Sequence, residues 1–161
     1  MGCDIHIYAE AKLPDGTWHM VHTFSATSPK AFKNADKPDV DYFRYRIEDR
    51  DYTFFNALAG VRGPGPEPRG LPKDVSPMVD HFARSWGSDG HSHSWLDAEA
   101  FAKLVVQHKL SSAEVAEWVE TRMKNTDPYW GLPRILEQYV GLDIDDYEEL
   151  KNVRFVFWFD N

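Results

Sequence analysis

The chain is poor in cysteine, in long apolar runs and in positive charge. Its 161 residues include one cysteine, Cys3, so no disulfide can form within the chain and no zinc site can be built mainly from thiolates. Such sparse cysteine is typical of proteins that stay in a reducing compartment. No apolar run approaches the roughly 20 residues that a membrane-spanning helix needs, and no charged-then-apolar leader opens the sequence. These features predict a cytoplasmic protein with no membrane partner.

The balance of charge is acidic, with 18 Lys and Arg against 26 Asp and Glu and a formal net charge of −8. This balance disfavours binding to a nucleic-acid polymer, because neutralising many phosphates requires clustered Lys and Arg. A local basic pocket for one small phosphorylated ligand remains compatible with it. The sequence also lacks the P-loop, the dinucleotide-binding glycine pattern, the nucleophile elbow and the H-E-x-x-H zinc motif.

Both ends of the chain have the period of β-strands. Residues 3–10 alternate, and the turn "LPDG" followed by "TWHMVHTF" predicts a β-hairpin over residues 3–24. Residues 153–159 are apolar on both faces, which is typical of a central strand, and we expect them to pair with residues 3–10. The hairpin and the last strand together predict a small antiparallel sheet.

The middle of the chain has the period of helices. Hydrophobic residues make up 42% of the sequence, enough for one core, so we expect a single domain over residues 1–161. The predicted fold is therefore α+β, a small antiparallel sheet covered by a helical middle region. Residues 25–50 are expected to form a long loop. The helices are predicted over 51–61, from Ser76, from Asp97 to about His108, from Ser111, and after Pro133.

One face of the predicted first strand carries Asp4, His6, Tyr8 and Glu10. For Tyr8 and Glu10 we expect this face to be the solvent side of the sheet. Asp4 and His6 lie one pleat apart, where a carboxylate can orient an imidazole and raise its basicity. This pair suits a general base or a metal ligand, and it suits a purely structural hydrogen bond equally well.

The stretch "GSDGHSHSWL" at residues 87–96 is the most unusual in the sequence, and we predict that it is a loop. His91 and His93 are two residues apart, so in an extended segment both rings would face one side. With Asp89 they could bind a metal ion, although one of them could instead cap the following helix. Trp95 is expected to anchor the loop on the sheet, so that His91 or His93 meets the polar face that carries Asp4 and His6.

Arg62 and Arg69 flank the proline- and glycine-rich stretch "RGPGPEPRG". Guanidinium groups match phosphate and carboxylate with two parallel hydrogen bonds, so the pair could hold an anionic ligand. The alternative is structural: one arginine packs on an aromatic ring and the other pairs with Asp74 or another acid.

Several stretches resemble a family of small proteins encoded in bacteriophage and bacterial genomes: "MGCDIHIY", "FNALAGVR", "PRGLPKDVSP", "WGSDGHSHSWL" and "VRFVFWFDN". Their order and spacing match over nearly the whole chain, with weaker matches over 25–50 and 107–150. The resemblance implies a bacteriophage or bacterial context rather than a mechanism. It directs attention to the same polar residues and adds Asp160.

Together these patterns predict a small hydrolase acting on a phosphate-containing small molecule or nucleotide. The alternative is a binding protein without catalysis, which captures a nucleotide-like ligand or blocks a host protein through the aromatic residues of loop 25–50. The cofactor, if any, would be a divalent metal ion. The candidate residues are His6, His91, His93 and Asp4 for catalysis; Arg62, Arg69, Ser92 and Trp95 for the ligand; and His6, His91, His93 and Asp89 for a metal.

Overall fold

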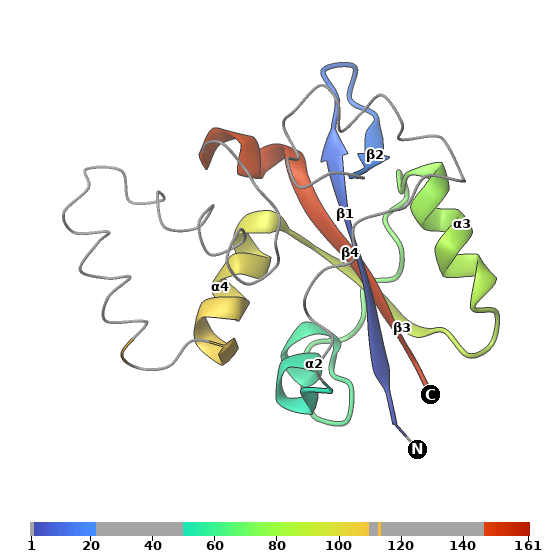
Figure 1. Cartoon of the computed structure of the whole chain (residues 1–161), viewed down its shortest axis with the longest axis vertical. Helices are drawn as coiled ribbons and strands as arrows, with labels where there is room; N and C mark the ends of the chain where they lie inside the picture. The colour runs from blue at the N-terminus through green and yellow to red at the C-terminus, as the bar shows by residue number, and fades with distance from the viewer. Residues whose placement is uncertain (1, 22–49, 110–112, 114–146) are drawn as a thin grey trace.

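The computed structural model describes residues 2–21, 50–109, 113 and 147–161, which form an antiparallel sheet packed between helices (Figure 1). The strand order is β2-β1-β4-β3. The strands are β1 (Asp4–Lys12), β2 (Trp18–Met20), β3 (His91–Asp97) and β4 (Val153–Asp160). The helices are α2 (Tyr52–Ala59), α3 (Pro77–Ser85), α4 (Ala98–Lys109) and the 3-10 helix η2 (Tyr147–Asn152). The fold is α+β, as predicted.

The two ends of the described chain pair with each other, which confirms the predicted sheet. β1 and β4 run antiparallel in one continuous register, from Asp4 opposite Asp160 to Ala11 opposite Val153. β4 lies between β1 and β3, and Val153 to Phe159 are all buried. An apolar strand covered on both faces is what the near-continuous hydrophobic run predicts.

Helices cover both faces of the sheet, with α3 on one side and α2 and α4 on the other (Figure 1). On the α2–α4 face, Ile7, Phe155 and Phe157 pack with Phe54 and Phe101. On the α3 face, the stripe of Met78, Val79 and Phe82 packs on Tyr8, Val156 and Trp158. The sheet is therefore the middle of three layers, and each face has its own core.

The prediction that Tyr8 and Glu10 face solvent is wrong. Tyr8 is 8% exposed and Glu10 is 0% exposed, because α3 and the segment before it cover this face. The alternation in β1 identifies two faces correctly. It cannot tell whether a second layer covers the polar one.

The prediction that residues 87–96 form a loop is also wrong, since His91–Asp97 is strand β3 at the edge of the sheet. His91 pairs with Phe159 and Ser94 with Phe157, so β3 has one extra residue between these pairs. Ser92 takes a left-handed conformation there, with φ of 52°. This bulge interrupts the period of two, and the strand has few of the apolar residues that identify strands in sequence.

Helices α2 and α4 begin and end close to the predicted bounds, 51–61 and Asp97 to about His108. The Asp51 carboxylate caps α2 by accepting from the Phe54 N–H, and Gly60 ends it with a φ of 65°. The Asp97 carboxylate accepts from the Ala100 N–H at the start of α4. Loop 25–50 and the helices predicted from Ser111 and after Pro133 lie outside the described residues, apart from residues 50 and 113.

A buried ion network ties α3 to the sheet. Arg154 on β4 is 4% exposed, and its Nε donates to Glu10 Oε2 at 2.6 Å. Its other nitrogens donate to Asp74 Oδ1 at 2.7 Å and to the Asp74 carbonyl at 3.0 Å. The second Glu10 oxygen accepts from the Ser76 N–H at 2.7 Å. Glu10 thereby holds the backbone of Ser76 just before α3, while the Ser76 side chain makes no cap bond to the helix.

We expect Glu10→Gln to lower the free energy of unfolding by about 3 kcal/mol, because it leaves the buried Arg154 guanidinium without its full counter-charge. Urea unfolding followed by circular dichroism measures this. Asp80→Asn is the control, since it breaks a solvent-exposed pair with Arg84 and should leave stability almost unchanged. Equal stability of the two variants would show that the buried network contributes no more than a surface pair.

Candidate functional site

The bulge at Ser92 sends the two histidines of β3 to opposite faces of the sheet. The His91 ring stacks on Phe159 with centroids 6.2 Å apart, on the α2–α4 face. The His93 ring stacks on Trp158 with centroids 5.8 Å apart, on the α3 face. The extra residue reverses the alternation, so His91 and His93 do not converge as the spacing alone suggests.

His6 and His93 lie on the same face, joined by Trp158. His6 is directly opposite Trp158 in the β1–β4 register, and their ring centroids are 5.9 Å apart. Trp86, at the end of α3, lies over His6 with centroids 4.1 Å apart. The structure thus brings His93 to the face that carries His6, with the indole of Trp158 as their shared contact.

A hollow of about 610 Å³ opens beside His93 on the α3 face. Three segments line it: β3, the segment before α3, and the end of α3 with Gly87, two residues beyond the helix. The lining residues are Gly70, Leu71, Ala83, Arg84, Gly87 and His93. Gly70 and Gly87 have φ of 77° and 53°, and a side chain built on either would meet only open space. The volume falls within the roughly 300–1,000 Å³ of pockets for small molecules.

Arg69 precedes Gly70, which lines the hollow, and the guanidinium of Arg69 packs on an aromatic ring. Its guanidinium lies over Trp95 at 5.2 Å from the ring centroid, and its backbone N–H donates to Ser94 Oγ at 3.2 Å. The neighbouring Gly70 N–H donates to the His93 carbonyl at 2.8 Å. Among the described residues no acid forms an ion pair with Arg69. Its donors are oriented by stacking and remain available to an anion.

Arg62 lies on the other face. Its guanidinium is over Tyr52 at 4.2 Å from the centroid, and the Tyr52 hydroxyl accepts from the Cys3 N–H at 3.4 Å. Arg62 also has a left-handed backbone, with φ of 58°. Because Arg62 and Arg69 stack on rings of different faces, the structure does not bring them together as one clamp.

His91 contacts Cys3 and Ser92. Its Nε2 lies 4.0 Å from Cys3 Sγ, and its Nδ1 is 3.0 Å from Ser92 Oγ. This order of thiol, imidazole and hydroxyl is that of a nucleophile with its base. However, Cys3 is 1% exposed, and burial raises the pKa of its thiol. A buried, protonated thiol is unreactive, so these contacts support a structural role.

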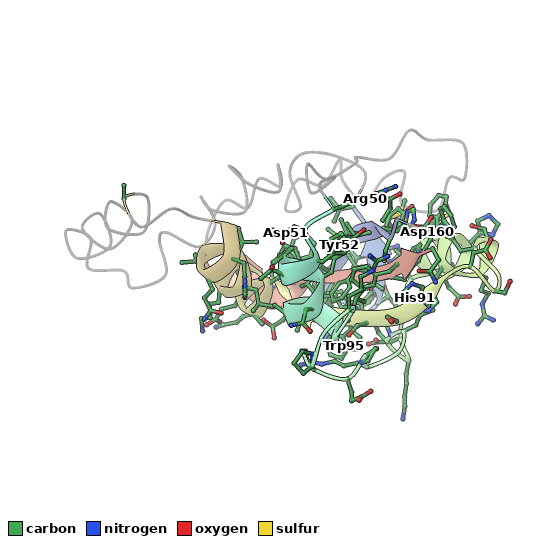
Figure 2. All side chains as sticks on the ribbon, turned by 90° about the horizontal axis from the view of Figure 1, so that it is seen from below. Arg50, Asp51, Tyr52, His91, Trp95 and Asp160 are labelled. Atoms are coloured by element: carbon green, nitrogen blue, oxygen red, sulfur yellow. The ribbon has the colours of Figure 1, made fainter. Side chains whose placement is uncertain are left out.

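Asp160, rather than Asp4, is the carboxylate beside His6. The His6 Nε2 lies 3.5 Å from Asp160 Oδ2, although the geometry makes no hydrogen bond and this nitrogen is buried without a partner in the described part of the chain. Asp160 Oδ1 accepts from the Asp4 N–H at 3.1 Å. Asp4 instead pairs with Arg50, whose Nε donates to Asp4 Oδ1 at 2.6 Å. That hydrogen bond lowers the pKa of the Asp4 carboxyl. Arg50, Tyr52 and Asp160 can be followed in Figure 2.

No group of three or more His, Cys, Asp or Glu side chains in residues 2–21, 50–109, 113 and 147–161 is arranged to hold a metal ion. The predicted ligands are separated by the sheet, with His91 on one face and His6 and His93 on the other. Asp89 is exposed in the turn after Trp86, where its N–H donates to the Trp86 carbonyl at 3.1 Å.

His93 is the titratable group best placed for proton transfer in the hollow. Burial, and then the charge of His91, lower its pKa below the ordinary value of 6.5. Near pH 7 the ring is therefore neutral and can accept a proton or a hydrogen bond.

Sequence reasoning found His93, Arg69 and Trp95 but missed Gly70, Leu71, Arg84 and Gly87 around them. Of the residues that were missed, only the two glycines could have been suspected from the sequence, because glycine is favoured where the backbone is left-handed.

Comparisons with protein-family models, with curated proteins and with solved structures give no match. The resemblance to bacteriophage and bacterial proteins therefore stays a prediction. In the described ranges no helix has the length and hydropathy to cross a membrane. The host-protein surface predicted in loop 25–50 lies outside these ranges.

The lowered pKa of His93 predicts how stability depends on pH. The unfolded chain binds a proton at His93 more readily than the folded protein does, so stability is lost as the pH falls from about 7 to 5. We expect His93→Gln to lose less stability than the wild type over this window, measured by urea unfolding. Parallel slopes, or a His93 NMR titration midpoint above 6.5, would contradict the burial of a neutral ring.

Proposed function

We propose that this protein binds a small phosphate-containing molecule in the hollow beside His93. The observation that carries the proposal is the combination of an open hollow, a neutral imidazole in its wall and a stacked guanidinium at the next residue along the chain. Pockets of this size with a few convergent polar groups and a perturbed pKa are typical of ligand sites. The acidic net charge of −8 favours a single small anion over a nucleic-acid polymer.

Arg69 is the anion-binding residue in this proposal. Its contact with Trp95 fixes the plane of the guanidinium, so fewer side-chain conformations are lost when a phosphate binds. Arg84, which also lines the hollow, already pairs with Asp80 at 2.7 Å. Its charge is balanced by that acid, so it has less capacity for a new partner than Arg69.

Hydrolysis of the bound molecule is the second candidate function, and the lowered pKa of His93 favours it. An imidazole that is neutral near pH 7 can take a proton from an attacking water molecule. In this version His93 is the general base and Arg69 holds the phosphate. Trp158 and, through it, His6 fix the position of the His93 ring.

Titration calorimetry with ribose phosphate tests the binding proposal. We expect Arg69→Lys to weaken binding about tenfold, because lysine cannot form the paired hydrogen bonds of a guanidinium. Arg62→Lys is the matched control, since Arg62 stacks on Tyr52 on the other face and should leave the affinity unchanged. Undetectable binding to the wild type, or equal losses in both variants, would overturn the proposal.

Release of inorganic phosphate from ribose phosphate tests the second candidate. We expect His93→Gln to abolish turnover while ribose phosphate still binds, because the base is lost and Arg69 is kept. Binding by the wild type without any phosphate release would leave a binding protein as the function.

A further inference from the structure

The two sides of the hollow differ in charge. The segment before α3 lines the hollow with Gly70 and Leu71, and the guanidinium of the preceding residue, Arg69, lies over Trp95. The opposing segment is the end of α3, whose residues Ala83 and Arg84 line the hollow and whose last residue is Ser85. A helix carries about half a negative charge at its C-terminal end, from carbonyls that lack intrahelical partners. The positive charge of Arg84 is balanced by Asp80 at 2.7 Å, so it does not cancel this negative end.

The backbone N–H groups of the two glycines in the wall are already used. The Gly70 N–H donates to the His93 carbonyl at 2.8 Å, and the Gly87 N–H donates to the Arg84 carbonyl at 3.1 Å. Neither is free to bind an anion, so these glycines do not form the kind of backbone nest that binds phosphate. Their role in the wall is to leave room, since each takes a left-handed conformation facing open space.

His93 adds a hydrogen-bond acceptor to the same interior. A neutral imidazole has one donor and one acceptor nitrogen, whereas the protonated ring would have two donors. Its stacking on Trp158 keeps the ring in place, and Gly90 packs against its Cε1 and Nε2 edge, with a hypothetical side-chain carbon 3.6 Å from each. The hollow therefore has an imidazole that can accept a hydrogen bond and the negative end of α3 in its wall, and a cation at Arg69, the residue next to Gly70 in the chain.

We propose that the ligand is a phosphate compound with an N–H donor at its far end, such as an amino-bearing nucleobase, which faces His93 and the end of α3 while Arg69 holds the phosphate. This rests on the proposed function, because it assumes that the hollow binds the anion. A ring nitrogen or carbonyl oxygen in place of the amino group would face other acceptors. An acceptor that the bound ligand shields from water and leaves without a donor costs free energy, which gives the selectivity.

Calorimetry on the full chain with two matched nucleotides tests this inference. Adenosine monophosphate carries an exocyclic amino group, and the monophosphate of purine riboside differs only in lacking it. We expect adenosine monophosphate to bind about tenfold more tightly, the effect of one buried hydrogen bond. Equal affinities, together with Arg69-dependent binding of ribose phosphate, would overturn this inference and leave the proposed function intact. Undetectable binding of all three compounds would overturn both.

A pair of variants locates the acceptor. His93→Phe keeps an aromatic ring on Trp158 but removes both ring nitrogens, so we expect the preference for the amino group to fall several-fold. His91→Phe makes the same change on the other face and should keep the preference. Cooperative thermal unfolding checks that each variant is folded. If His93→Phe does not fold, the comparison of the two nucleotides on the wild type decides the inference alone.

Discussion

The guanidinium of Arg154 is the group on which the arrangement of this fold depends. It is 4% exposed on the inner strand β4, so the charge must be neutralised by groups that come to it. Glu10 supplies one carboxylate from β1, and Asp74 supplies another from the segment before α3. The guanidinium also lies over the indole of Trp18, 4.0 Å from the ring centroid, so β2 contacts the same group. One side chain thereby fixes where α3 starts, and with it the face on which the hollow lies.

The same face continues as a row of stacked rings toward the hollow. Tyr8 stacks on Trp158, which also contacts His6 and His93, so the imidazole of His93 rests on a fully buried indole. A side chain held in this way keeps one position when a ligand arrives, which reduces the entropy lost on binding. The left-handed residue Ser92 makes this possible, because the bulge directs His93 to the α3 face. Backbone strain at such a position is often associated with function.

Periodicity alone predicted the elements that bury apolar side chains, because burial follows the repeat of the strand or helix. The pairing of β1 with β4 is in this class, and the residue type at Asp97 predicted the cap of α4. Glu10 was misplaced because one strand's pattern does not reveal the layer above it. His91 and His93 were placed on one side because an added residue in a ladder leaves no regular trace in sequence. The candidate hollow could not be predicted either, since Gly70, Arg84 and His93 meet only through tertiary packing.

The position of β4 in the sheet has a consequence for how the chain folds. Glu10 and Arg154 are separated by 144 residues, yet they are direct neighbours in the sheet. β1 and β3 both hydrogen-bond to β4, so neither can complete its ladder until that strand has been synthesised. Contacts this distant in sequence make folding slow, since a long loop must close before they form. During translation the nascent chain therefore carries unpaired strand edges, which other chains or chaperones can bind.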